Sequence, residues 1–310
     1  AVGSNLTIKP CQELTDGGGF CIAHQQMFGI AINSWIAEKF FGNKKNKKID
    51  DFKLPGFMSI FNDNMICTSI LMLAFFGSIL TILGKDYLIQ ENFLKEGQSM
   101  IFYTIETCLY FGVYLSILQL GVRIFVSELT QSFQGIAEKI LPGSVPGVDC
   151  AVIYGFGSSN AIPIGFLAGF AGQILAIIAL IILKSPVLVI CGFVPVFFDN
   201  ATIAVFANEK GGLKASLILP FISGICQVFG SALIAGWVGM AVYGGYLGMW
   251  DWALVWPVMT GVMKIGSYLG ISIIVLFLLF IPQIQYRLDK EGYFLITEDF
   301  EKYKNLKNKV

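Results

Sequence analysis

Charged residues are scarce in this sequence, and so is any excess of charge of one sign. Only 14% of its 310 residues are charged and 55% are hydrophobic, whereas about a quarter of the residues in an ordinary soluble domain are charged. The formal net charge is zero, so there is no basic surface of the kind that binds nucleic acid. This balance excludes an ordinary soluble domain and indicates an integral membrane protein.

The cysteines are scattered, and no two of them form a CxxC pair. The seven are Cys11, Cys21, Cys67, Cys108, Cys150, Cys191 and Cys226. An odd number without paired spacing argues against a disulfide framework and against a zinc site. We therefore expect neither a metal site nor a cofactor, and we interpret the cysteines as small hydrophobic residues.

The motifs of hydrolytic and phosphate-binding enzymes are also missing. The sequence holds a single histidine, His24, and no HExxH, GxSxG or P-loop pattern. A nucleophile needs a neighbouring base, and only His24 offers an imidazole for that role. We therefore expect a protein that is not an enzyme, and a membrane enzyme acting on lipid is the least favoured class.

Long apolar windows are abundant, and each matches the length of about 20 residues that a membrane-spanning helix needs. They predict about six to eight crossings or re-entrant segments, and no alternating pattern of a β-barrel is present. The windows are 20–41, 57–83, 99–122, 161–183, 186–207, 215–238, 240–262 and 265–284. The sequence thus predicts an all-α polytopic membrane protein, and the amphipathic segment 124–140 is expected at the interface or between two bundles.

The charges between the windows indicate the orientation of the chain. Loop 42–53 holds five lysines, and loop 84–98 holds two lysines and three acids. Because lysine-rich loops stay in the cytoplasm, we place loop 42–53 there, together with the charged tail 286–310. Residues 1–19 are typical of a loop between two helices, and no signal peptide is visible. We expect residues 1–310 to be one partial membrane domain from a longer protein.

Two segments have the pattern of helices broken inside the membrane. In 146-PGVDCAVIYGFGSSNAIPIGF-166, Asp149 follows Pro-Gly, and in 192-GFVPVFFDNATIAVFANEKGG-212, Asp199 and Asn200 follow a proline. Transporters use such breaks to build binding sites near the middle of the bilayer. A carboxylate at that depth costs about 3 kcal/mol, which makes both aspartates candidates for a functional role.

Structural explanations for the same residues stay open. Asp199 also fits a helix N-cap at a membrane surface, because Asp before an apolar run is a start signal. Asp149 also fits a loop that begins with Pro-Gly. Residues 155–160 also fit a simple turn between two helices.

The first window is unusual because it holds three strong hydrogen-bonding side chains in a row. In 20-FCIAHQQMFGIAINSWIAEKFF-41 these are His24, Gln25 and Gln26. Successive residues of a helix point about 100° apart, so the three side chains cannot share one face. We expect at least one of them to face a polar interior or to pair with another helix.

Several stretches, in this order along the chain, resemble the ascorbate-type permeases of the bacterial phosphotransferase system, which are enzyme IIC components. They are 17-GGGFCIAHQQMFGI-30, 121-GVRIFVSELTQSFQGIAEKILPG-143, 146-PGVDCAVIYGFGSSNAIPIGFLAGF-170 and 194-VPVFFDNATIAVFANEKGG-212. The resemblance implies homodimers in the bacterial plasma membrane, with a substrate-binding core domain and a dimer scaffold in each subunit. It also implies further N-terminal helices, which this sequence lacks.

The resemblance implies partners as well. A cytoplasmic enzyme IIB, phosphorylated through enzyme IIA, would phosphorylate the delivered substrate, and enzyme IIC would carry no phosphate itself. The substrate would be L-ascorbate or a related sugar acid, contacted by His24, Gln25 and Asp149. A carboxylate accepts several O–H donors, while amide and imidazole groups donate and accept. Five further residues are candidates either for substrate binding or for breaking a helix: Gln26, Ser159, Asn160, Asp199 and Asn200.

A second class of protein stays open, an ion-coupled secondary transporter of a small polar solute. In that case Asp149 or Asp199 would bind the coupling ion. The two classes differ in their energy source, because a phosphotransferase permease needs phosphoenolpyruvate and delivers a phosphorylated product.

Overall fold

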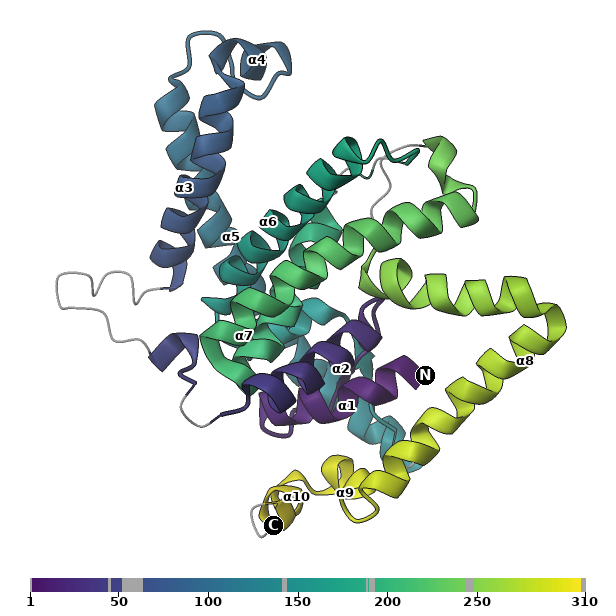
Figure 1. Ribbon diagram of the computed structural model, residues 1–310. Coiled ribbons are helices and arrows are strands. Elements are labelled where there is room, and N and C mark those ends of the chain that lie inside the picture. Colours follow the sequence, from purple (N-terminus) through teal and green to yellow (C-terminus); the bar gives the residue numbers. More distant parts are fainter. Residues whose placement is uncertain are drawn as a thin grey trace.

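The computed structural model is almost entirely helical in the part of the chain that it describes. The described residues are 2–43, 46–51, 64–140, 144–187, 189, 193–243 and 248–307. Within them, two short strands, β1 (Cys21–Ile22) and β2 (Gly147–Val148), pair in parallel. A bundle of crossing helices carries two arms that project from it (Figure 1). This architecture confirms the all-α membrane fold that the composition predicts.

The expected loop over residues 1–19 is mostly a helix, α1 (Val2–Thr15). Its polar side chains hold the segment that follows. The Thr7 hydroxyl donates to the Ile22 carbonyl at 3.1 Å, and the Gln12 amide donates to the Phe20 carbonyl at 2.9 Å. Polar residues that suggest a solvated loop therefore serve as internal hydrogen-bond donors. Composition alone does not distinguish these two roles.

The helix predicted over 20–41 begins later than expected. Strand β1 and a turn precede helix α2 (Met27–Ile36), which continues as a π-helical turn over Ala37–Phe41. The polar run from His24 to Gln26 therefore lies in the turn and not in a helix, which corrects the helical interpretation. Pairing with β2 keeps the chain extended up to this point.

Helices α3 (Asn64–Leu83) and α5 (Met100–Lys139) form one arm, and α4 (Lys85–Gln90) lies at its tip (Figure 1). The first residues of the predicted window 57–83 lie outside the described ranges. The amphipathic segment 124–140 is not a separate linker, because α5 continues through it as far as Lys139. A 40-residue helix therefore replaces the predicted span and linker.

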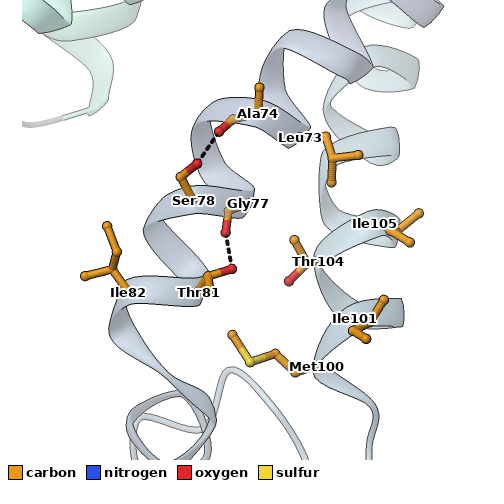
Figure 2. A pocket seen from close by; sticks show the side chains of 10 residues that line it. All are labelled: Leu73, Ala74, Gly77, Ser78, Thr81, Ile82, Met100, Ile101, Thr104 and Ile105. Carbon is orange, nitrogen blue, oxygen red and sulfur yellow. Dashed lines mark hydrogen bonds between the residues drawn. The ribbon is translucent and has the colours of Figure 1, made fainter.

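A depression between α3 and α5 has apolar walls (Figure 2). The Ser78 hydroxyl donates to the Ala74 carbonyl at 2.6 Å, and the Thr81 hydroxyl donates to the Gly77 carbonyl at 2.7 Å. Both hydroxyls are thus used within their own helix, as is usual for Ser and Thr in membrane helices. The depression is therefore lined mainly by hydrocarbon groups.

Helices α6 (Ala161–Ile182) and α7 (Phe193–Trp237) pack together at the centre of the bundle. Helix α6 confirms the predicted window 161–183. Helix α7 contains the predicted windows 186–207, from residue 193 on, and 215–238. It holds both because it is a helical hairpin rather than one straight helix.

The turn of this hairpin is at Gly212, where φ is 69°. The Ser216 hydroxyl donates to the Ala204 carbonyl at 3.1 Å, although twelve residues of straight helix would span about 18 Å. Glycine adopts this left-handed conformation at little cost. The Leu213 N–H, released by the turn, donates to the Lys47 carbonyl at 3.0 Å. A neighbouring segment thus satisfies the backbone at the break.

The break predicted at Asp199 and Asn200 is wrong, because both residues lie inside the first half of α7. Neither residue caps a helix. The Asn200 amide donates to the Val196 carbonyl at 2.8 Å, and the Asp199 carboxylate accepts from Gln227 in the second half. Side-chain partners on the hairpin, and not a helix terminus, accommodate these two polar groups.

The second arm consists of α8 (Trp256–Leu288), preceded by a 3₁₀ turn (Met240–Tyr243) and a π-helical turn (Asp251–Val255). Helix α8 also folds back, at Ser267, where φ is 48°, and it forms an open V (Figure 1). The half before Ser267 includes the end of the predicted window 240–262, and the half after it includes most of the predicted window 265–284.

Four helices among the described residues are long and apolar enough to cross a membrane. They are Met100–Phe133, Ala161–Ile182, Val194–Trp237 and Asp251–Leu288, and Thr68–Leu83 is a shorter apolar helix. The predicted number of segments was larger because each of the two folded-back helices includes parts of two predicted windows, and because window 20–41 holds only the short helix α2. The prediction of several apolar helical segments is thus confirmed, but their connections differ.

The charged tail 286–310 is folded over its described part. Helices α9 (Gly292–Glu298) and α10 (Phe300–Lys307) lie near α1 (Figure 1). The Asn5 amide donates to the Tyr293 hydroxyl at 3.0 Å, and Lys304 pairs with Asp16 at 2.8 Å. The end of the described chain is therefore attached to its beginning.

We expect the substitution Gly172→Ala to destabilise the contact between α6 and α7. A Cβ atom at this position would lie 2.1 Å from the Phe221 carbonyl oxygen, so the two helices must separate. Overpacking of this kind costs about 1–3 kcal/mol. The matched control is Gly236→Ala on α7, where an added Cβ meets nothing within 4 Å. Thermal unfolding of the two variants in detergent measures the difference, and equal melting temperatures would contradict it.

Candidate functional site

Strands β1 and β2 bring two distant parts of the sequence to one place. Cys21 pairs with Gly147 and Ile22 pairs with Val148, and the Ala23 N–H extends the ladder to the Val148 carbonyl at 2.8 Å. Because the strands are parallel, the residues that follow them emerge at the same edge. His24 follows β1 and Asp149 follows β2, so the strand pair determines that these two side chains meet.

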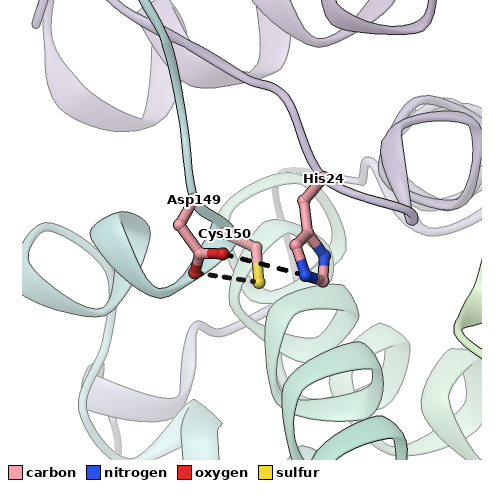
Figure 3. A group of neighbouring side chains, drawn as sticks. All are labelled: His24, Asp149 and Cys150. Atoms are coloured by element: carbon pink, nitrogen blue, oxygen red, sulfur yellow. Dashed lines mark hydrogen bonds and ion pairs between the residues drawn. The ribbon is translucent and has the colours of Figure 1, made fainter.

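The side chains of His24, Asp149 and Cys150 converge at this edge (Figure 3). His24 Nε2 lies 3.7 Å from Asp149 Oδ2, and Cys150 Sγ lies 3.6 Å from Asp149 Oδ1. The Asp149 side chain is 58% exposed and the His24 side chain is 26% exposed. The cluster is therefore open to a solute on the Asp149 side and buried on the Cys150 side.

Asp149 has a structural role in addition to its exposed position. It is the N-cap of a 3₁₀ helix, Cys150–Gly155, and its Oδ1 accepts the Ala151 N–H at 2.9 Å. This bond fixes the side chain, as N-cap bonds generally do. Its other oxygen, Oδ2, is the one that faces His24. The loop interpretation and the functional interpretation of Asp149 are thus compatible.

Cys150 forms the inner side of the cluster. Burial raises the pKa of the Cys150 thiol, and hydrogen bonds from Thr202 and Gln26 act in the opposite direction. The Thr202 hydroxyl in α7 lies 3.2 Å from the Tyr154 hydroxyl. A layer of neutral polar groups therefore lies between the exposed cluster and the interior of α7.

The three consecutive polar residues point to three different places. The Gln26 side chain is buried and its amide donates to the Thr202 hydroxyl at 3.4 Å. The Gln25 side chain is exposed, and its carbonyl accepts the Asp251 N–H at 3.0 Å. Gln26 meets the expectation that at least one of the three side chains faces a polar interior. The three side chains point in different directions because they lie in a turn, and not because they lie in a helix.

Asp251 is a residue that the sequence analysis missed. Its buried carboxylate accepts the Phe28 N–H at 3.2 Å and the Gly29 N–H at 3.0 Å. It thus supplies from the second arm the acceptor that the N-terminus of α2 needs. The sequence does show an acidic residue between two tryptophans in the apolar window 240–262. The backbone groups that Asp251 binds, however, lie more than 220 positions away in the sequence.

Asp199 belongs to a second polar group, within the α7 hairpin. The Gln227 amide donates to Asp199 and, at 2.9 Å, to the Gly248 carbonyl, while the Gln173 amide donates to the Gln227 oxygen at 2.8 Å. These groups are almost completely buried. Asp199 Oδ1 has no hydrogen-bond partner among the described residues. The network joins α6 to both halves of the hairpin.

Ser159 and Asn160 lie in the turn that precedes α6. The Ser159 hydroxyl donates to the Gln119 oxygen on α5 at 3.3 Å. Asn160 stands at the N-cap position of α6 without a capping bond from its side chain, and its Oδ1 is buried without a partner among the described residues. The break predicted in 146–166 is confirmed, and a turn joins its two helical parts.

The sequence of the chain is similar to known sugar permease components. Residues 1–254 match the sequence model of the EIIC-GAT family, described as the PTS system sugar-specific permease component. Over 252 residues the chain is 33% identical to a protein of Mycoplasma pneumoniae named "Ascorbate-specific PTS system EIIC component". The alignment covers 74% of this chain and 38% of that relative. The chain therefore spans well under half the length of this curated relative.

Proposed function

Because the chain belongs to the EIIC-GAT family of sugar-specific permease components of the phosphotransferase system, we propose that it carries a sugar acid across the bacterial plasma membrane. The substrate would be phosphorylated on the cytoplasmic side by a phosphorylated enzyme IIB, itself supplied by enzyme IIA. The chain would be the transporter subunit, and the partner would perform the chemistry. L-Ascorbate is the first candidate, since the Mycoplasma pneumoniae relative is named for it.

The observation that supports this proposal most directly is the meeting of His24 and Asp149 at the edge of the strand pair. The two side chains come from segments 125 residues apart, and both are partly accessible. A sugar acid presents several O–H donors, which a carboxylate accepts, and ring oxygens, to which an imidazole N–H donates. The exposed Gln25 amide, on the same turn, adds a group that donates and accepts.

The remaining candidate residues would support the proposed substrate contacts without touching the substrate. Gln26, buried against Thr202, would hold the turn, and Ser159 would tie the second break to α5. Asp199 and Asn200 would stabilise the hairpin and not touch the substrate. We thus narrow the proposed substrate contacts to His24, Gln25 and Asp149.

The proposal extends to the assembly. The family resemblance implies a homodimer with a moving core and a fixed scaffold in each subunit. The α6–α7 centre with its strand pair would be the core. Helix α8, of which only 11% of the most apolar window is buried, would meet lipid or the second subunit in the scaffold.

The decisive experiment identifies the chemical form of the transported substrate. Right-side-out membrane vesicles that contain the protein are loaded with phosphoenolpyruvate, the general carrier proteins, enzyme IIA and enzyme IIB, and are given labelled ascorbate. We expect ascorbate phosphate inside. Uptake of another sugar acid only, again as its phosphate, would keep the mechanism and replace the substrate. Free ascorbate accumulating without phosphoenolpyruvate would instead establish an ion-coupled carrier.

A further inference from the structure

Three kinds of metal-ligating side chain meet at the edge of the strand pair. We propose that His24, Asp149 and Cys150 form a reversible binding site for a divalent cation of the Zn²⁺ type. Their ligand atoms, one from each residue, all lie within 4.8 Å of one another. The scattered cysteines gave no sign of such a site in the sequence, because β1 and β2 bring its residues together from distant segments.

The separations between these atoms are close to those between neighbouring ligands of a bound zinc ion. With Zn–S of about 2.3 Å and Zn–N or Zn–O of about 2.0–2.1 Å, tetrahedral angles place S and O about 3.6 Å apart and N and O about 3.4 Å apart. In the structure the Cys150 thiol donates to Asp149 Oδ1 at 3.6 Å, and His24 Nε2 lies 3.7 Å from Asp149 Oδ2. The two neighbours therefore face different oxygens, and the carboxylate presents both of them to the ion. A separation of 3.7 Å is too long for a hydrogen bond.

The chemistry of the three donors agrees with this assignment. Imidazole, thiolate and carboxylate together suit Zn²⁺, whereas Mg²⁺ and Ca²⁺ prefer oxygen alone. On binding, the S–H bond of Cys150 breaks, an S–Zn bond forms, and the proton passes to water. Three protein ligands leave the fourth position for a water molecule on the exposed side of Asp149, the arrangement of an open zinc site.

Two of the ligands are held in place before any ion arrives. The Ala151 N–H fixes Asp149, and the strand ladder fixes the backbone next to His24. Metal-bound histidines usually donate a hydrogen bond from their second ring nitrogen, which holds the ring in place. His24 lacks this support, because its Nδ1 has no hydrogen-bond partner among the described residues. We therefore expect an exchangeable ion rather than a permanent structural one.

Binding of the ion would have a consequence for transport. It would occupy the same atoms of His24 and Asp149 that the proposed function assigns to the sugar acid, and so would inhibit uptake. This consequence rests on the proposed function, but the site itself does not. Direct binding of the metal therefore tests the site independently of any transport assay.

The test is a titration of the purified chain in detergent with Co²⁺, followed by displacement with Zn²⁺. We expect one Co²⁺ per chain, a near-ultraviolet thiolate-to-metal absorption band, and loss of the band on addition of Zn²⁺. The substitution Cys150→Ser should abolish the band and weaken Zn²⁺ binding about tenfold or more, since even the loss of a residue that only hydrogen-bonds to a metal ligand costs 10–100-fold. Asp149→Asn, which keeps the N-cap, should weaken binding without loss of fold.

The matched control is Cys226→Ser, which removes a half-buried cysteine of α7 outside the cluster. It should leave the band and the stoichiometry unchanged. A band that persists in Cys150→Ser, or its absence in the folded wild-type chain, would overturn the site. If Zn²⁺ binds as expected while no sugar acid is taken up, the metal site stands and only the transport proposal fails.

Discussion

The substitution Asp149→Asn is expected to weaken binding of the sugar acid about 5- to 150-fold, which corresponds to about 1–3 kcal/mol. The change keeps the shape of the side chain and removes its charge. Asparagine caps helices about as well as aspartate, so the bond to Ala151 N–H is preserved and the 3₁₀ helix remains. What is lost is the strength of a charge-assisted hydrogen bond to substrate hydroxyls.

Binding of labelled ascorbate to the purified chain measures this effect. The control is Asp86→Asn, which removes an exposed carboxylate at the tip of the α3–α5 arm. Its affinity should match that of the wild type. If Asp149→Asn also binds with wild-type affinity, Asp149 is only a helix cap and the proposed substrate contacts must be revised.

The substitution Gln227→Leu is expected to have the largest effect on stability, a loss of about 3–5 kcal/mol in the free energy of unfolding. Leucine fills a similar volume but ends three hydrogen bonds at once. The Asp199 carboxylate and the Gly248 carbonyl lose the Gln227 amide as a donor, and the Gln173 amide loses its acceptor. In a completely buried site no water replaces them, so each group retains its desolvation cost.

A double-mutant cycle identifies the source of this loss. Asp199→Leu combined with Gln227→Leu removes the stranded carboxylate as well, and it should recover a large part of the stability because an apolar pair replaces a buried polar one. Unfolding in detergent by denaturant titration provides the free energies. If Gln227→Leu alone changes stability by less than about 0.5 kcal/mol, which is typical of a surface site, the network does not hold the hairpin together.

The sequence predicted the apolar helices well but not their turns. Windows 161–183 and 99–122 match α6 and the first part of α5, since length and hydrophobicity are local properties. The position of the α7 turn was misjudged because Asp199 and Gly212 both appear in the sequence as interruptions. What decides between them is a partner, Gln227, that lies 28 positions away, and no local pattern reveals it.

In the candidate site, too, local features could be predicted from the sequence and contacts between distant segments could not. The family resemblance pointed to His24 and Asp149, and the structure places them 3.7 Å apart. Their meeting depends on two strands of only two residues each, which are too short to be recognised from alternation of residue types. The roles of Asp251 and Cys150 were missed for a related reason, because each depends on a contact between segments far apart in the chain.

The attachment of α10 to α1 constrains the route of the chain through the bilayer. Tyr303 lies 3.5 Å from Glu13, and Glu13 also pairs with Lys210 beside the α7 turn. Because charged side chains are costly in the hydrocarbon core, we expect the first helix, the hairpin turn and the last helix to lie on one side of the membrane. On that expectation, the chain crosses the membrane an even number of times between α1 and the turn, and again between the turn and α10. Whichever compartment one of these three points faces, the other two share it.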